Sequence, residues 1–276
     1  MGSIWLTDLP DVLRAGGLDV DTWPGWETRS RSSGGYDAIR AVFCHHTASN
    51  TSPTNDMSYM WDNTSGDQPI GALYLARDGR FTVGAAGATN TQGKGGPWNL
   101  STGTIPKDAG NANGIAIEAA NAGTGEPWPA VQTSAYVAAC RALCSAYGLE
   151  PSWDVLSHRE WCEPSCPGRK VDPVGPSPYA VGATSWNMAA FRSDVAQAAP
   201  PKPVPPTPKD EYMLYIAVPK YPGANDNSEW WAVFESGAVR RAVNSDVTFA
   251  GLAGIPQIDQ NSAEHDAYLR GIAIKA

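Results

Sequence analysis

Three of the four histidines in the sequence lie where short apolar segments end. Residues 38–44 run into His45 and His46, and residues 155–158 end at His158. Functional side chains gather at strand ends in α/β sheets, and imidazole is a common ligand of zinc. A single histidine is more often a core or surface residue, so the interpretation depends on the residues that accompany these three.

The segment that follows His158 supplies a carboxylate and a cation, Asp172 and Lys170. Two histidines from separate strands together with Asp172 would provide three ligands, and a catalytic zinc site keeps its fourth position for water. Lys170 lies two residues before Asp172, so both side chains project to the same side if the stretch is extended. A cation there could stabilise the oxyanion that forms when activated water attacks an amide.

Glu118 is the only charged residue of an otherwise apolar stretch at residues 114–119. A carboxyl group in apolar surroundings has a raised pKa and suits proton transfer. The alternative is a structural glutamate held by a salt bridge, and the sequence leaves both interpretations open.

The elements that must position these residues are strands that alternate with helices. Asp78 and Gly79 separate two apolar segments and predict a hairpin. Residues 84–113 have no periodicity, and a loop of this length in a compact domain is usually functional. The order of elements predicts an α/β domain with helices packed on a mixed central sheet. The expected strands are residues 38–44, 73–77, 81–85, 114–119 and 155–158, and the expected helices are residues 133–147 and 185–197.

Composition and charge limit the partners. A net charge of −8 and a pI near 5.0 argue against nucleic acid, which requires clustered lysine and arginine. No run approaches the roughly 18 apolar residues that cross a bilayer, so we expect no membrane insertion. Residues 1–13 lack the apolar core of a secretion signal. The many tryptophans and tyrosines suit stacking on sugars, although most are expected in the core.

A proline-rich stretch at residues 198–209 divides the chain. Proline at this density ends helices and cannot donate to a sheet, so we expect an extended linker. Residues 1–197 then form the main domain with an N-terminal extension. Residues 210–276 predict a small β-rich domain, because they contain short apolar runs at residues 213–218, 230–234 and 238–243.

Three sequence motifs follow one another in a fixed order. They are VFCHHTA at residues 42–48, NGIAIE at residues 113–118, and His158 followed by PGRKVDP at residues 167–173. In this order they resemble the motifs of the type 2 N-acetylmuramoyl-L-alanine amidase family, which includes phage lysins, recycling amidases and peptidoglycan-recognition proteins. Residues 9–29 also resemble the openings of actinobacteriophage lysins. The resemblance implies the type 2 amidase fold and a zinc-dependent peptidoglycan hydrolase of the bacteriophage endolysin type.

The resemblance also implies roles for single residues. His45 and His158 correspond to the family's first two zinc ligands. His46 takes the position beside the first ligand, where it would support the site without binding the metal. Glu118 corresponds to the catalytic carboxylate, and Lys170 to the catalytic lysine of members that have one.

The third ligand has two candidates. Some phage members use a cysteine eight residues after the second histidine, which is Cys166 here, whereas recycling amidases use the aspartate that corresponds to Asp172. We favour Asp172, because the family's lysine lies two residues before the third ligand and Lys170 fits that spacing. The distance from His158 to Asp172 is four residues longer than in the recycling amidases, which implies an inserted loop that contains residues 162–165. Cys162 and Cys166 would then close this inserted loop as a disulfide or remain free thiols.

The activity that the resemblance implies is hydrolysis of the amide between N-acetylmuramic acid and L-alanine. The alternatives are a noncatalytic peptidoglycan-binding protein and a peptidase of the stem peptide. We expect a monomer without a signal peptide that is made in the host bacterial cytoplasm and reaches the cell wall after release by another factor. Residues 210–276 would bind the wall. One departure from the family is Gly71, which falls near the position of a catalytic tyrosine in some members.

Overall fold

The structure of the chain is a computed structural model that describes residues 2–63, residues 68–197 and four strands of the C-terminal part. The chain divides into two compact units, Met1–Val204 and Pro205–Ala276, and each is described by itself. The linker expected at residues 198–209 lies outside the described residues.

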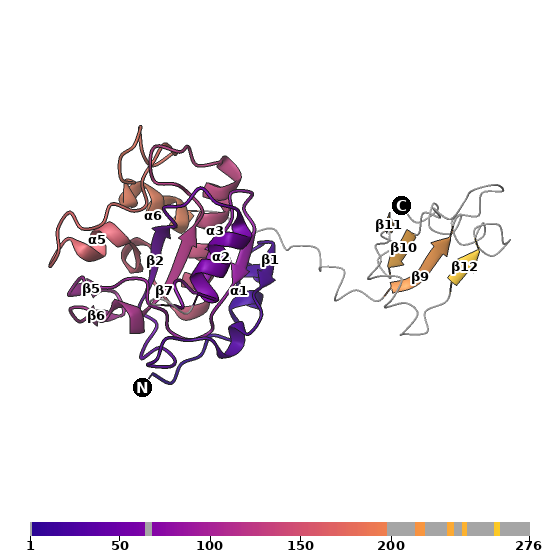
Figure 1. Ribbon diagram of the computed structural model, residues 1–276, viewed down its shortest axis with the longest axis horizontal. Helices are drawn as coiled ribbons and strands as arrows, with labels where there is room; N and C mark the ends of the chain where they lie inside the picture. Colours follow the sequence, from indigo (N-terminus) through magenta and orange to yellow (C-terminus); the bar gives the residue numbers. More distant parts are fainter. Residues whose placement is uncertain are drawn as a thin grey trace. The chain divides into compact units, whose positions relative to one another are not determined.

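A six-stranded mixed sheet forms the centre of the N-terminal unit (Figure 1). The strand order is β1-β4-β3-β7-β2-β8. Strands β3, β7, β2 and β8 are parallel to one another, β4 is antiparallel to β3, and β1 is parallel to β4. The predicted mixed sheet is confirmed, as is the hairpin between β3 and β4. The strands are β1 (Val20–Thr22), β2 (Ala41–His46), β3 (Leu73–Leu75), β4 (Phe81–Val83), β7 (Gly114–Ala119) and β8 (Val155–Ser157).

Helices cover both faces of the sheet. Because side chains alternate along each strand, successive strand residues pack against helices on opposite faces. Val42 of β2 and Ile117 of β7 belong to the main core, which α1, α3 and α6 cover. Phe43 of β2 points the other way, against α5, and α2 packs on that second face as well. His45 and Glu118 project to this second face, because successive residues of a strand alternate. The helices are α1 (Leu9–Ala15), α2 (Pro53–Trp61), α3 (Ala130–Tyr147), α4 (Pro151–Asp154), α5 (His158–Cys162) and α6 (Met188–Gln197).

Helices α3 and α6 correspond to the two predicted helices at residues 133–147 and 185–197, but both begin at other residues. Helix α3 begins at Ala130, and Thr133 lies inside it, where its hydroxyl donates to the Ala130 carbonyl at 3.0 Å instead of capping the helix. Helix α6 begins at Met188, after Asn187, whose side chain accepts the N–H groups that follow. Elements α1, α2, α4, α5 and β1 have no counterpart among the predictions, and His158, predicted as the end of a strand, is the first residue of α5. Within the described residues, no helix is long and apolar enough to cross a membrane.

The long segment at residues 84–113 is irregular for most of its length. It contains the short ribbon of β5 (Trp98–Leu100) and β6 (Gly103–Ile105), and a 3-10 turn, η2 (Gly110–Ala112). It passes over the buried indole of Trp161 in α5, where a Cβ on Gly96 would lie 2.5 Å from the ring. Glycine is required there by this close approach and by a φ of +63°.

The described part of the C-terminal unit is a four-stranded sheet in the order β11-β10-β9-β12. Strand β10 is antiparallel to β9 and β11, and β12 is parallel to β9. Three of these strands lie within the apolar runs that predict a β-rich domain, whereas β12 was not predicted. The strands are β9 (Met213–Val218), β10 (Trp231–Phe234), β11 (Val239–Arg241) and β12 (Gln257–Asp259).

Candidate active site

Parallel pairing of β2 with β7 places two of the predicted site residues side by side. His45 pairs in register with Glu118, and Glu118 pairs on its other side with Tyr74 of β3. Side chains of residues paired in register point to the same face of a sheet. His45 and Glu118 therefore lie together near the carboxyl ends of parallel strands, where sites form in α/β sheets.

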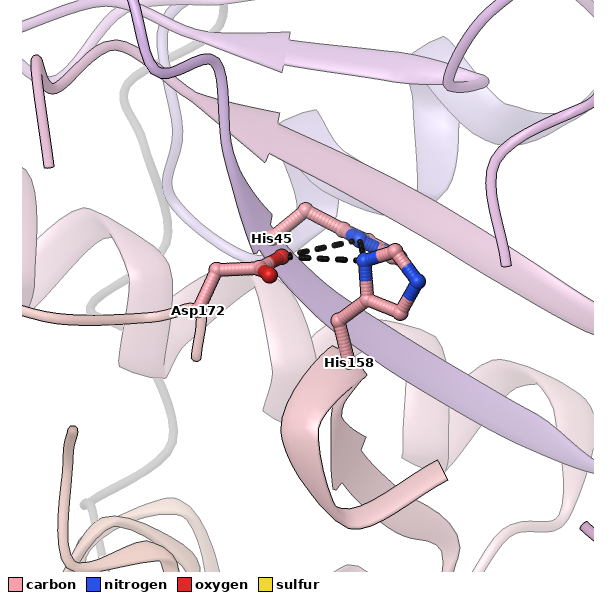
Figure 2. Close-up of side chains that lie close together, drawn as sticks. All are labelled: His45, His158 and Asp172. Atoms are coloured by element: carbon pink, nitrogen blue, oxygen red, sulfur yellow. Dashed lines mark hydrogen bonds and ion pairs between the residues drawn. The ribbon is translucent and has the colours of Figure 1, made fainter. Parts of the chain in front are cut away.

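A capping box at the start of α5 brings His158 to the same end of the sheet. The Ser157 hydroxyl accepts the N–H of Glu160, and the Glu160 carboxylate accepts the N–H of Ser157. The chain therefore turns into a helix directly after β8, and His158 is its first residue. Its Nδ1 lies 2.9 Å from Nδ1 of His45 (Figure 2).

Asp172 reaches the two histidines from the loop that follows α5. Its backbone carbonyl accepts the N–H of Arg159 at 3.2 Å, which ties this loop to the first turn of the helix. Its Oδ2 lies 3.2 Å from Nδ1 of His45 and 3.1 Å from Nδ1 of His158 (Figure 2). The three side chains are buried, and even Asp172 is only 7% exposed. The structure thus brings together the three residues that the sequence predicts as ligands.

The geometry of these three donor atoms fits a metal ion. Bonds of about 2.0–2.1 Å in a tetrahedral zinc site separate the donor atoms by roughly 3.3 Å, and the separations here are 2.9, 3.1 and 3.2 Å. His158 Nε2 donates to the backbone carbonyl of Gln92 at 3.0 Å, which leaves Nδ1 available as a ligand. Among the described residues, no other group of three His, Cys, Asp or Glu side chains converges in this way.

Electrostatics favour the protonation states that bind a metal. Burial lowers the pKa of His45 to about 4, and the neighbouring His158 adds to this effect, while Asp172 opposes it. Burial acts to raise the pKa of Asp172, but the contacts of its carboxylate with His158 and His45 hold that pKa well below its usual range. Metal ligands must be neutral imidazoles and ionised carboxylates, so both shifts prepare the site.

Glu118 lies beside this centre without an ion-pair partner among the described residues. It is 8% exposed, and its Oε2 is buried and makes no hydrogen bond. Burial and the negative charge of Asp172 raise the pKa of Glu118 to about 8, and the charge of Lys170 acts in the opposite direction. The salt-bridged structural glutamate that the sequence left open is therefore not what the structure contains. A carboxyl group with this pKa can take up and release a proton near neutral pH.

The site opens into a cleft of about 780 Å³, a size typical of ligand-binding pockets. Glu118, His158 and Asp172 line it, and so does Lys170, which is half-buried. His46 lines the cleft as well, and its Nδ1 is buried without a hydrogen bond. All the predicted site residues except the deeper His45 therefore border one cavity.

Cys166 lies apart from the three converging residues. Its thiol donates to the backbone carbonyl of Lys94 at 3.3 Å and accepts a contact from Arg169 Nε at 3.4 Å. Cys162 donates to the same carbonyl at 3.4 Å, and all five cysteines are free thiols. The inserted loop is therefore held by hydrogen bonds to residues 84–113 and not by a disulfide.

Sequence reasoning missed two groups that border the site. Asp56 of α2 is 5% exposed and lines the cleft, where its two oxygens accept the hydroxyls of Thr51 and Tyr74 at 2.6 and 3.0 Å. A serine before a proline, Ser52, was the signal for a helix start that could have placed it. The carbonyl of Gln92 is a backbone atom, so no residue type could have indicated it.

The part of the chain that contains this site matches a known protein family. Residues 35–175 match the family model described as N-acetylmuramoyl-L-alanine amidase, Amidase_2. The chain belongs to this family. The match covers slightly more than half of the sequence and contains all five predicted site residues, so the resemblance that the sequence motifs indicated is confirmed.

Several solved structures are similar to this amidase. N-acetylmuramoyl-L-alanine amidase LysC from Clostridium intestinale has 14% identity over 64% of this chain and 97% of its own, with a TM-score of 0.42. The Staphylococcus aureus hydrolase AmiA, in complex with its ligand, has 15% identity over 70% of this chain and 95% of its own, with a TM-score of 0.44. Drosophila PGRP-LB has 14% identity over 69% and 99%, with a TM-score of 0.40. No curated protein matches the chain.

Separate substitutions of Asp172 and Cys166 test which of them is the third ligand. We expect Asp172→Ala to lose bound zinc, because it removes one of three converging donor atoms, and Cys166→Ser to retain it. Zinc content after dialysis, measured by atomic emission on folded protein, checks both variants. Loss of zinc from Cys166→Ser with retention in Asp172→Ala would show that the cysteine is the ligand.

The raised pKa of Glu118 predicts a pH-dependent stability in the metal-free amidase. A folded-state pKa of about 8, above the usual 4.5, means that stability falls as the pH rises between these values. Glu118→Gln removes this penalty, so the variant should unfold like wild type below pH 4 and be more stable by roughly 2–4 kcal/mol at pH 8. Urea unfolding of metal-free wild type and metal-free Glu118→Gln, measured from pH 4 to pH 8, gives the difference in the free energy of unfolding. If the free energy of unfolding changes with pH in the same way for both proteins, the pKa of Glu118 is not raised.

Proposed function

We propose that this amidase is a zinc-dependent peptidoglycan hydrolase of the endolysin type, which cleaves the amide between N-acetylmuramic acid and L-alanine. The observation that carries the proposal is the convergence of His45, His158 and Asp172 at the base of a cleft that Glu118 also lines. Membership of the amidase family supports the bond that is cut. The lysin-like residues 9–29 support the role in bacteriophage release.

Each of these residues has a separate role in the proposed hydrolysis. His45, His158 and Asp172 would hold the zinc ion, which would supply water of lowered pKa and polarise the amide carbonyl. Glu118 accepts the proton of the attacking water, which its buried position and raised pKa allow. Lys170, on the cleft wall, stabilises negative charge on the carbonyl oxygen in the transition state. Protonated Glu118 then returns the proton to the departing amine of L-alanine.

Mass spectrometry of digested cell wall tests the bond that is cut. We expect glycan-free peptides with new L-alanine amino termini, and we expect their release to stop when zinc is chelated and resume when zinc is restored. Glu118→Gln should keep its zinc and lose about 10²–10⁴-fold in turnover, as is typical when a general base is removed. Peptides cut within the stem would instead identify a peptidase, and intact wall that still binds the protein would identify a noncatalytic binder.

We further propose that the unit Pro205–Ala276 binds the cell wall. It is a separate compact unit with its own sheet, so it can act as a tethered module that raises the concentration of the amidase at an immobile substrate. A chain ending at residue 204 should cleave soluble muropeptides as well as the full chain does. Cosedimentation with purified walls should recover much less of it than of the full chain. Equal recovery would contradict wall binding by this unit.

A further inference from the structure

The long segment at residues 84–113 reaches the metal centre through one backbone group. His158 Nε2 lies 3.0 Å from the carbonyl oxygen of Gln92. A carbonyl oxygen can only accept, so Nε2 carries the proton of the neutral imidazole, and Nδ1 keeps its lone pair. Nδ1 is the atom that faces His45 and Asp172. The Gln92 carbonyl therefore selects both the ring orientation and the tautomer in which His158 can act as a ligand.

A single side chain holds that carbonyl in place. Asn111 Oδ1 accepts the backbone N–H groups of Thr91, Gln92 and Gly93 at 3.0, 2.8 and 3.2 Å. The C=O of Gln92 and the N–H of Gly93 belong to one planar peptide group and point in opposite directions. Because Asn111 binds this N–H, the carbonyl on the other side is directed at His158.

The same asparagine also supports the chain beside Glu118. The Thr91 hydroxyl accepts the N–H of Gly71 at 2.8 Å. Gly71 lies directly against the carboxylate side chain, since a Cβ on Gly71 would come within 2.9 Å of Glu118 Cγ. Two branches of one hydrogen-bond network thus run from Asn111, one to His158 and one to the backbone that packs on Glu118.

We infer that Asn111 is a positioning residue for the metal centre, because it fixes the Gln92 carbonyl that orients His158 and the backbone that borders Glu118. The inference rests on the proposed function, since it takes His158 as a zinc ligand. Arg169 Nη2 also contacts the Gln92 carbonyl, but at 3.4 Å, and its closer partner is the carbonyl of Lys94 at 2.6 Å. Arg169 therefore does not replace the asparagine.

The side chains that test the inference either remove the acceptor oxygen of Asn111 or keep it. Leucine has nearly the same shape and no acceptor, so Asn111→Leu leaves three N–H groups without their partner. Aspartate keeps the acceptor oxygen, so Asn111→Asp preserves the three hydrogen bonds. Asn99 supplies the control, because its Oδ1 accepts only the hydroxyl of Thr104 on the exposed β5–β6 ribbon. Asn99→Leu therefore changes an asparagine in the same segment without touching the network.

The experiment measures zinc affinity by competition with a chelating dye in the full chain. We expect Asn111→Leu to bind zinc about 10–100-fold more weakly than wild type, as is typical when a group that orients a ligand is removed. Asn111→Asp and Asn99→Leu should bind it like wild type. The second readout is ¹⁵N NMR of the histidine rings in zinc-free protein. It should show His158 protonated at Nε2 in wild type and a mixture of tautomers in Asn111→Leu.

The outcomes separate this inference from the proposed function. Wild-type protein that binds no zinc would overturn the proposed metal centre, while the tautomer of His158 would still test the role of Asn111. Wild-type zinc affinity and an unchanged tautomer in Asn111→Leu would overturn the inference alone. If Asn111→Leu does not fold, the shorter Asn111→Ser takes its place in both measurements, and a wild-type His158 protonated at Nδ1 would by itself contradict the inference.

Discussion

A buried carboxylate held between two imidazoles is the interaction on which the site depends. Asp172 is only 7% exposed, and such an environment opposes its negative charge. Neither ring readily compensates that charge, because the Gln92 carbonyl holds the single proton of neutral His158 at Nε2, and burial lowers the pKa of His45 to about 4 and so opposes a positively charged ring. A divalent cation removes the conflict, because it neutralises the carboxylate while both rings stay neutral.

The sheet and the long loop contribute to this centre in different ways. The register of β2 and β7 sets His45 beside Glu118, and a change of one residue in that register would turn either side chain to the opposite face. The loop supplies no side-chain ligand, but its Gln92 carbonyl orients His158. Because Glu118 is buried without a hydrogen-bond partner for Oε2, its ionised form costs stability, and the raised pKa of about 8 makes that carboxylate a stronger proton acceptor.

Strand ends and motif spacing were sufficient to predict the three residues that converge but not the atoms that hold them in place. His45 and Glu118 could be predicted, because polar residues at the ends of apolar strands stand out and alternation fixes their face. Helix α5 was missed, because the apolar run before His158 continues the strand pattern, although Ser157 and Glu160 have the spacing of a capping box. The loop at residues 84–113 could not be predicted in detail, because backbone hydrogen bonds, not residue periodicity, determine its course.

We propose that one metal ion binds between His45, His158 and Asp172, and X-ray absorption at the zinc edge can identify its ligands. The spectrum of the zinc-loaded full chain reports the elements bound to the metal and their distances. We expect only nitrogen and oxygen neighbours, at about 2.0–2.1 Å. A sulfur neighbour at about 2.3 Å would contradict it, because one of the five cysteines would then be a ligand in place of Asp172.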